Sequence, residues 1–263
     1  MTKIAFSQLI AGALFSLCLA SLPAEATVDH TYVSGKGTDT GECVSPTVAC
    51  RTFAYAITQT SVSGEIIVID PANYGPVTIT KSISIVADGS GPAGIIVATG
   101  NAITINAAQG VVFNLRGLTL DGEGTAAFGV AVTSGGSLTI SNCFVRNFQT
   151  GILINGQSMN VSILNSVMNN NGNGLMIVGS GFTNTYLTVR NSVANYNVTG
   201  FSVTGATATF ADSMATGNAR AGILIGPVTG DVSQSQLFSY GDNEIDNNGT
   251  NVSGGTLAPL AKR

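Results

Sequence analysis

Few residues of this sequence carry charges that can do chemistry, and four of them hold related places in a repeat. Asp121 and Arg146 each lie four places after the same repeat position, so we expect them to meet on neighbouring coils. A carboxylate beside a guanidinium is suited to acid–base chemistry or to holding a polar ligand. The competing interpretation is an exposed ion pair worth less than ~1 kcal/mol, and it is favoured here. Arg116 and Arg190 both precede the repeat position by one residue, three coils apart.

That separation of Arg116 from Arg190, roughly 14 Å by strand spacing, is too long for one catalytic centre but fits two contacts on a polyanionic chain.

A second polar group combines amides with an aromatic ring, which are groups that hydrogen-bond to and stack on sugars. The same amides are also typical of turns, where they are selected for backbone geometry. This predicted binding set consists of Asn169, Asn171, Asn195, Tyr196 and Asn197.

The element that positions these residues is a repeat, which occurs four times between residues 136 and 226. One column of the repeat holds Asn or Asp at spacings of 23, 26 and 21 residues, and a second column holds Gly at spacings of 23, 26 and 22. A period of this length with short alternating apolar runs is typical of a β-solenoid. The two columns consist of Asn142, Asn165, Asn191 and Asp212, and of Gly151, Gly174, Gly200 and Gly222.

Each copy opens on a strand that buries one face, as Leu138 with Ile140 and Val161 with Ile163 show. One coil cannot bury that face alone, so the coils stack in parallel at ~4.8 Å. The sequence therefore predicts an all-β fold, a single-stranded right-handed parallel β-helix of roughly eight or nine coils. The Asn column predicts a structural ladder at the corners, which stops or changes partner at Asp212 because a carboxylate does not donate. The Gly column predicts a positive φ or a close backbone approach.

The N-terminal part predicts export and a cap. Residues 1–26 combine Lys3, an apolar core and the run Ala24-Glu25-Ala26, which is typical of a signal peptide cleaved before Thr27. Cys43 and Cys50 predict one local disulfide in an oxidising compartment, whereas Cys143 is expected to be a small packed residue rather than a nucleophile.

The predicted domains are a signal peptide at 1–26, a cap at 27–65, the β-helix at 66–255 and a tail at 256–263. Within the cap, residues 51–60 predict a short amphipathic helix that covers the open edge of the first coil.

Composition limits the partners. Charged residues make up 9% of the chain, the formal net charge is -4 and no basic run occurs, which argues against nucleic acid and anionic membranes. No segment after the signal is apolar enough to insert into a membrane. We expect no metal or other cofactor. Asp242, Glu244 and Asp246 alternate as the ligands of a calcium loop do. The Gly and the terminal Glu of such a loop are missing, so a solvated end cap is favoured over a calcium site.

The repeats, with YVSGKGTDTGECVSPTVACRTFAYAI and ANYGPVTITKSISIVADG, resemble the right-handed parallel β-helix superfamily of the pectin-lyase-like fold. Small exported bacterial members with repeats of the pectate-lyase type are the most similar. The resemblance covers nearly all of residues 31–255 and implies the fold, which carries lyases, hydrolases, esterases, epimerases and adhesins.

The catalytic motifs of those enzymes do not occur here. No two Asp are adjacent, and the one histidine, His30, precedes the coils. The sequence therefore predicts a secreted or periplasmic, monomeric protein with a non-catalytic surface that binds a polysaccharide or the cell envelope. The alternative is a carbohydrate-active enzyme, a polysaccharide lyase before a glycoside hydrolase, with Asp121, Arg146, Arg116 and Arg190 as its candidate residues.

Overall fold

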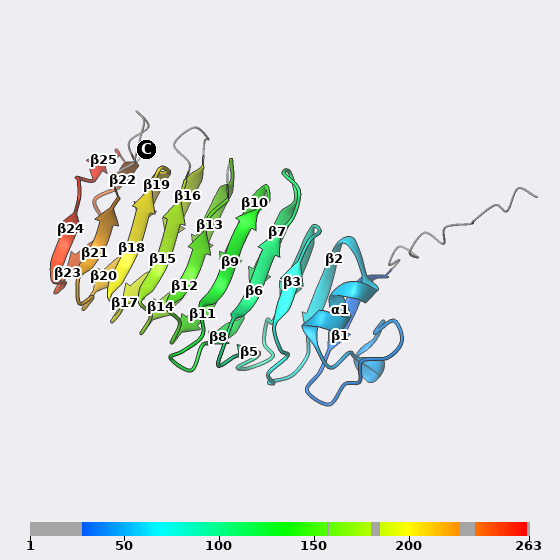
Figure 1. The fold of residues 1–263 in the computed structure, drawn as a ribbon. Coiled ribbons are helices and arrows are strands. Elements are labelled where there is room, and N and C mark those ends of the chain that lie inside the picture. Colours follow the sequence, from blue (N-terminus) through cyan, green and yellow to red (C-terminus); the bar gives the residue numbers. More distant parts are fainter. Residues whose placement is uncertain (1–27, 157, 180–184, 227–234, 262–263) are drawn as a thin grey trace, which may run out of the picture.

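The computed structural model describes residues 28–156, 158–179, 185–226 and 235–261. The expected signal peptide lies outside these residues and stays a prediction. The described chain is a stack of coils in which three parallel sheets form the walls, and Figure 1 shows the coils following one another from the blue N-terminal end to the red C-terminal end.

Every coil contributes its strands to the three sheets in turn, and all printed strand pairs are parallel, for example β10 with β13. The ten-stranded sheet contains, in spatial order, β1 (Val28–Val33), β2 (Thr60–Val68), β4 (Ile83–Val86), β7 (Val112–Arg116), β10 (Ser137–Ser141), β13 (Asn160–Leu164), β16 (Tyr186–Arg190), β19 (Thr207–Ala211), β22 (Gln236–Ser239) and β25 (Ala258–Pro259). The seven-stranded sheet contains β5 (Gly94–Ile96), β8 (Thr119–Asp121), β11 (Phe144–Arg146), β14 (Val167–Asn169), β17 (Val193–Asn195), β20 (Met214–Thr216) and β23 (Glu244–Asp246). The eight-stranded sheet contains β3 (Val77–Ile79), β6 (Asn101–Asn106), β9 (Phe128–Ser134), β12 (Thr150–Ile154), β15 (Asn173–Val178), β18 (Thr199–Thr204), β21 (Ala221–Ile225) and β24 (Thr250–Ser253).

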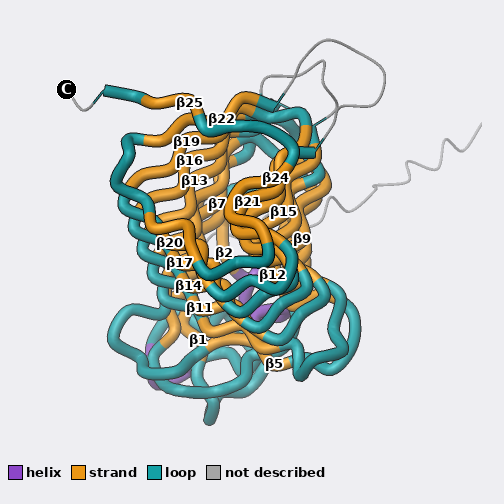
Figure 2. Tube along the Cα trace, turned by 90° about the vertical axis from the view of Figure 1, so that its left-hand side faces the viewer, coloured by secondary structure: helices purple, strands orange, loops and turns teal. Residues whose placement is uncertain are grey.

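The parallel β-solenoid that the sequence predicts is confirmed, with about seven turns. Viewed nearly along its axis in Figure 2, the strands stack coil upon coil. Seven strands of each sheet form these turns, and β1, β2, β3 and β25 extend the stack at its ends.

The core consists of inward side chains that stack on their counterparts one coil away. Leu138 pairs with Val161, and Val161 with Leu187, so identical places repeat along the stack. All three are at most 2% exposed. Burial of this kind stabilises each coil only through its neighbours, since a single coil has no second layer to cover its inner face.

The corners need special backbone geometry. Asn142, Asn165, Asn191 and Asp212 all have φ between 48° and 54°, the left-handed region that Asn and Asp tolerate. Of the two alternatives predicted for the Gly column, the structure shows the close backbone approach at Gly151. A Cβ on Gly151 would lie 2.6 Å from the carbonyl oxygen of Gly174. Any side chain there would push neighbouring coils apart.

The first coil is closed by a cap that contains α1 (Phe53–Gln59) and a short 3-10 turn, Pro46–Val48. The expected helix is therefore present. Thr52 begins it by accepting a hydrogen bond from the Tyr55 N–H at 3.1 Å, and Phe53 packs on Tyr74 with ring centroids 5.0 Å apart. The predicted disulfide between Cys43 and Cys50 is confirmed, with a Cα–Cα distance of 5.4 Å.

Candidate functional site

Asp121 and Arg146 meet on neighbouring coils. They are partners in the register of β8 and β11, and Arg146 Nε donates to Asp121 Oδ2 at 2.8 Å. Asn147 Nδ2 donates to the other oxygen, Asp121 Oδ1, at 2.8 Å. The Arg146 guanidinium also lies 5.5 Å from the ring centroid of Phe144. Both oxygens of the carboxylate are therefore engaged within the protein.

The environment of Asp121 keeps it ionised. Burial raises its pKa, but hydrogen bonds from Asn147, from the Glu123 N–H and from Arg146 outweigh that effect and lower the pKa overall. A general acid of a glycosidase needs the opposite, a raised pKa that keeps the carboxyl protonated. Asp121 is therefore unsuited to be a proton donor near neutral pH.

Arg116 and Arg190 stand in one outward column of the ten-stranded sheet, with Ser141 and Leu164 on the two strands between them. Each arginine has a carboxylate partner. Arg116 Nε donates to Asp88 Oδ1 at 2.9 Å, and Arg190 Nε lies 3.7 Å from Asp212 Oδ2. The longer contact leaves the Arg190 side chain 65% exposed. Of the two, Arg190 is the better placed to contact a ligand.

The predicted binding set divides into two groups. Asn169 and Asn195 are neighbours on β14 and β17 and continue the outward row that Asp121 and Arg146 begin. Their Oδ1 atoms are buried and accept no hydrogen bond. Tyr196 follows at the corner and is 66% exposed. An added hydrogen-bond donor would stabilise this row, because a buried acceptor without a partner costs free energy.

Asn171 and Asn197 are not exposed to a sugar, contrary to their place in the predicted binding set. They belong to a second column, the buried Asn ladder of Asn171, Asn197, Asn218 and Asn248. Asn197 is 2% exposed. Its Oδ1 accepts from the Asn171 N–H at 2.9 Å, and its Nδ2 donates to the Met168 carbonyl at 3.0 Å. Both amide groups are therefore used to hold adjacent coils together.

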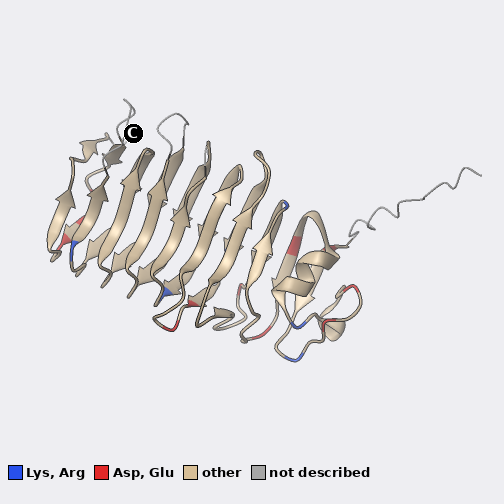
Figure 3. Cartoon of the chain, viewed as in Figure 1, with Lys and Arg blue, Asp and Glu red and all other residues tan. Residues whose placement is uncertain are grey.

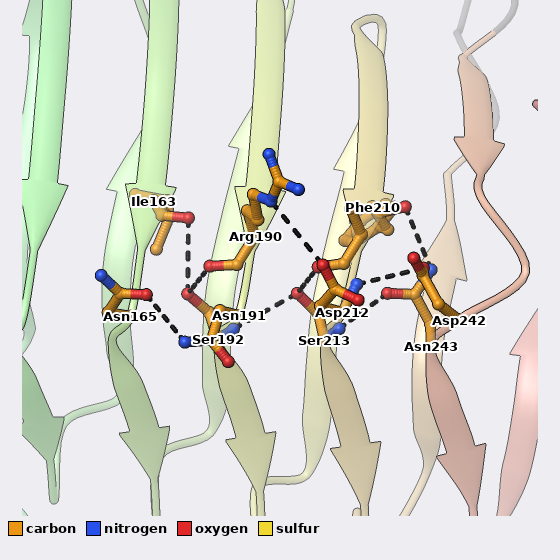
Figure 4. Close-up of polar contacts among 11 residues, drawn as sticks. Ile163, Asn165, Arg190, Asn191, Ser192, Phe210, Asp212, Ser213, Asp242 and Asn243 are labelled. Carbon is orange, nitrogen blue, oxygen red and sulfur yellow. Dashed lines mark hydrogen bonds and ion pairs between the residues drawn. The ribbon is translucent and has the colours of Figure 1, made fainter. Parts of the chain in front are cut away.

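The column that the sequence predicts as the structural ladder lies at the preceding corner and is exposed. There Asn191 Nδ2 donates to Asn165 Oδ1 at 2.8 Å, whereas Asp212 faces Arg190 and its N–H donates to Asp242 Oδ1 at 3.0 Å (Figure 4). Beside it runs a buried row of hydroxyls in which each N–H donates to the next side chain, for example Ser192 to Ser213 Oγ at 3.3 Å.

Cys143 begins this hydroxyl row, where its N–H donates to Ser166 Oγ at 3.1 Å. The side chain is 4% exposed, and burial raises the pKa of its thiol to about 11. Nucleophilic attack requires the thiolate. Cys143 therefore serves packing rather than chemistry near neutral pH.

One cleft lies at the exposed corner, and we call it the corner cleft. Its volume is about 530 Å³, and it is lined by Arg190, Ala211, Asp212, Tyr240, Asp242 and Leu260 with Ala261. Arg190 and Ala211 are register partners, and Tyr240 takes the next place because Phe210 pairs with Ser239. The small Ala211, which is 6% exposed, lies between the strand positions of Arg190 and Tyr240, and these positions are about 9.6 Å apart along the stack by strand spacing.

The corner cleft contains residues that the sequence did not single out as a binding set. Tyr240 is 37% exposed at its rim. Asp242 belongs to an enlarged corner, since two residues, Gly241 and Asp242, stand where the preceding coil has Asp212 alone. Gly241 has a φ of 78°, as this turn requires. The extra residue next to an aromatic is the one signal in the sequence, where the acidic run predicts a solvated end cap.

Charged residues are sparse elsewhere in the described part of the chain and lie mainly in turns or at strand ends, as the coloured ribbon of Figure 3 shows. Within the described ranges no group of three or more His, Cys, Asp or Glu side chains is placed to hold a metal ion. The same part of the chain contains no helix long and apolar enough to span a membrane.

Comparisons with known proteins add no assignment to this geometry. A scan of protein-family models gave no match, and neither the search of curated proteins nor that of solved structures gave one. The function must therefore be argued from the corner cleft and its chemistry.

Proposed function

We propose that this chain is an exported, monomeric β-helix protein that binds a polysaccharide at the corner cleft without cleaving it, in the periplasm or outside the cell. The observation that carries the proposal is the combination of Arg190, Tyr240 and two carboxylates around Ala211. A sugar ring offers an apolar face for an aromatic ring and hydroxyls for guanidinium and carboxylate groups.

Membership of the pectin-lyase-like superfamily is part of this proposal, as is a right-handed coil. The support is the resemblance of the repeats, together with three parallel sheets whose corners carry Asn. Parallel strands joined by a crossover are right-handed in about 98% of cases, which favours that hand here.

Binding is favoured over catalysis because the sequence's candidate acid is unsuited to donate a proton. The partners of Asp121 lower its pKa, whereas the general acid of a glycosidase needs a raised pKa. The alternative of a lyase or hydrolase is favoured by one observation, the presence of Asp212 and Asp242 beside Arg190 in a single cleft. Such a trio resembles the charge arrangement that cleavage of an acidic polysaccharide needs.

The test is retention of the chain on a panel of immobilised neutral and acidic polysaccharides, with and without calcium. Tyr240→Ala removes the stacking ring and Ala211→Leu enlarges a side chain that lines the cleft, so each should weaken binding about tenfold. Tyr186→Ala is the matched control, because Tyr186 is 48% exposed on the same sheet and does not line the cleft. Retention that is unaffected by both cleft variants would overturn the proposal.

The same incubations separate binding from turnover. Unsaturated products or new reducing ends that disappear in Asp212→Asn or Asp242→Asn would establish the enzyme alternative. Retention without products supports binding alone.

A further inference from the structure

The corner that follows the seven-stranded sheet has the same backbone in five successive coils. The residue after each short strand has a φ between 52° and 65°, and these residues are Asn147, Asn170, Tyr196, Gly217 and Asn247. Asn and Gly tolerate this left-handed backbone, whereas a bulky aromatic residue adopts it at a cost in free energy. Tyr196, with a φ of 55°, is therefore the exception in its column.

Burial does not offset the cost of this conformation. The Tyr196 side chain is 66% exposed, which is the highest fraction among the exposed large hydrophobic side chains of the described chain. Its ring lies against the next coil, since a Cβ on Gly217 would be 3.0 Å from both Cδ1 and Cε1 of Tyr196. The missing side chain at Gly217 thus leaves room for the ring at the surface. A strained residue that packs so little is expected at a functional site rather than at a structural one.

Two amides beside Tyr196 carry a second cost of the same kind. Asn195 directly precedes Tyr196, and Asn169 is the register partner of Asn195 on β14. Both residues are partly exposed, yet their Oδ1 atoms are buried without a hydrogen-bond partner. A buried acceptor that lacks a donor lowers stability. A hydroxyl is both donor and acceptor, so it can pair with the NH2 group of such an amide or, if the amide turns over, with its oxygen.

We propose that Tyr196, Asn195 and Asn169 form a second sugar contact, in which a sugar ring stacks on the Tyr196 ring and its hydroxyls bind the two amides. The three side chains are uncharged, and Arg146 on the next coil is already paired with Asp121, so a neutral sugar unit is favoured over an acidic one.

This inference rests on the proposed function in taking a polysaccharide as the ligand, but the place is different. The corner cleft lies at the corner before the seven-stranded sheet, and the Tyr196 contact lies at the corner after it. A polymer that binds at both places is held with a higher effective affinity than at either alone.

The probe is cellohexaose, a neutral oligosaccharide, titrated into the ¹⁵N-labelled chain and followed by the signals of the side-chain amides. We expect saturable shifts at Asn169 and Asn195. Asn160, an exposed amide on the ten-stranded sheet, is the internal control and should not shift. Because the contact is uncharged, rising salt should leave the dissociation constant unchanged.

Tyr196→Asn should have two opposite effects. The urea midpoint should rise, because Asn tolerates the φ of 55° better than Tyr. The dissociation constant for cellohexaose should rise about tenfold or more, because the stacking ring is lost. Stability gained with function lost is typical of a binding residue and not of a structural one. Tyr186→Asn is the matched control: Tyr186 is 48% exposed and is not among the residues of positive φ, so this change should not raise the midpoint or alter the affinity.

Gly217→Asn tests the place of the ring while Tyr196 is kept. The column already holds Asn in three coils, so the backbone accepts the change. The new side chain occupies the space against which the Tyr196 ring lies, and the dissociation constant should rise about threefold or more.

Unchanged affinity in Tyr196→Asn, or a lowered urea midpoint in that variant, would contradict the proposal. So would the absence of shifts at Asn169 and Asn195, which would favour a protein partner for the exposed ring. Tyr240→Ala should leave these shifts unchanged, so failure of the corner cleft and failure of the Tyr196 contact give different results.

Discussion

At the scale of single residues, a carboxylate's partners decide what chemistry it can do. Asp121 has an arginine, an amide and a backbone N–H as donors, so it is a fixed anion although it faces outward from its sheet. The carboxylate of Asp212 lies 3.7 Å from Arg190 Nε, and the side chain is 49% exposed. The first arrangement joins two coils, and the second leaves a polar pair open to a ligand.

Replacing Asp121 by Asn tests the first arrangement. The folded-state pKa is lowered, so the contribution of Asp121 is present above the unfolded value of 3.8 and is lost as the pH falls through the folded-state pKa. At neutral pH we expect Asp121→Asn to lower the free energy of unfolding by up to ~1 kcal/mol. Urea unfolding should show this difference closing as the pH is lowered below 3.8. Arg146→Gln should behave alike, and a difference that persists in acid would contradict the assignment.

At the scale of elements, each coil is joined to the next by side chains that serve as both donor and acceptor. The buried Asn ladder does this at the corner after the seven-stranded sheet, and the hydroxyl row does it at the corner before. Backbone N–H groups at a corner cannot all find partners in the sheets, so these side chains supply them. The two columns therefore specify the turns as well as stabilising them.

Asn197→Ala removes one buried rung, so the Asn171 N–H and the Met168 carbonyl oxygen lose their hydrogen bonds to this side chain. We expect the free energy of unfolding to fall by about 1–3 kcal/mol, measured from urea midpoints. Asn191→Gly is the control, because Gly tolerates the φ of 48° there and only an exposed rung is lost. That variant should lose less than ~1 kcal/mol, and equal losses would show that burial does not distinguish the two columns.

At the scale of the whole molecule, a stack of parallel strands must protect its two ends. The N-terminal end has α1 and the disulfide-closed loop. The C-terminal end has β23 and β25, which carry Glu244, Asp246 and Pro259. Acidic side chains and proline on an edge strand oppose pairing with another chain.

A chain with Glu244→Val, Asp246→Thr and Pro259→Val should therefore self-associate as its concentration rises, which light scattering after size exclusion would detect. Removal of charges away from the edge, at Glu42 and Glu123, is the control and should leave the mass unchanged. If the edge variant keeps the mass of the unaltered chain at all concentrations, these residues do not protect the end.

The sequence predicted the parts of the fold that repeat. Leu138 and Val161 recur with alternation, and an alternating strand that cannot bury its face alone has to stack in parallel. Asn142 and Asn165 mark the corners, because few residues tolerate the left-handed backbone found at both. The pairing of Asp121 with Arg146 followed from the same count. The third sheet was not foreseen, because strands of three residues such as Val167–Asn169 are too short to show alternation.

Only the tertiary structure decided which amides are buried and what meets at the corner cleft. Asn169 and Asn171 lie two places apart and look alike in sequence, yet one is on a sheet face and the other points under a turn, since a left-handed residue, Asn170, lies between them. Tyr240 lies near Arg190 because β16 pairs with β19 and β19 pairs with β22, although the coils that connect these strands differ in length. The repeat fixes each coil's pattern, whereas the neighbours of a surface residue depend on every insertion between them.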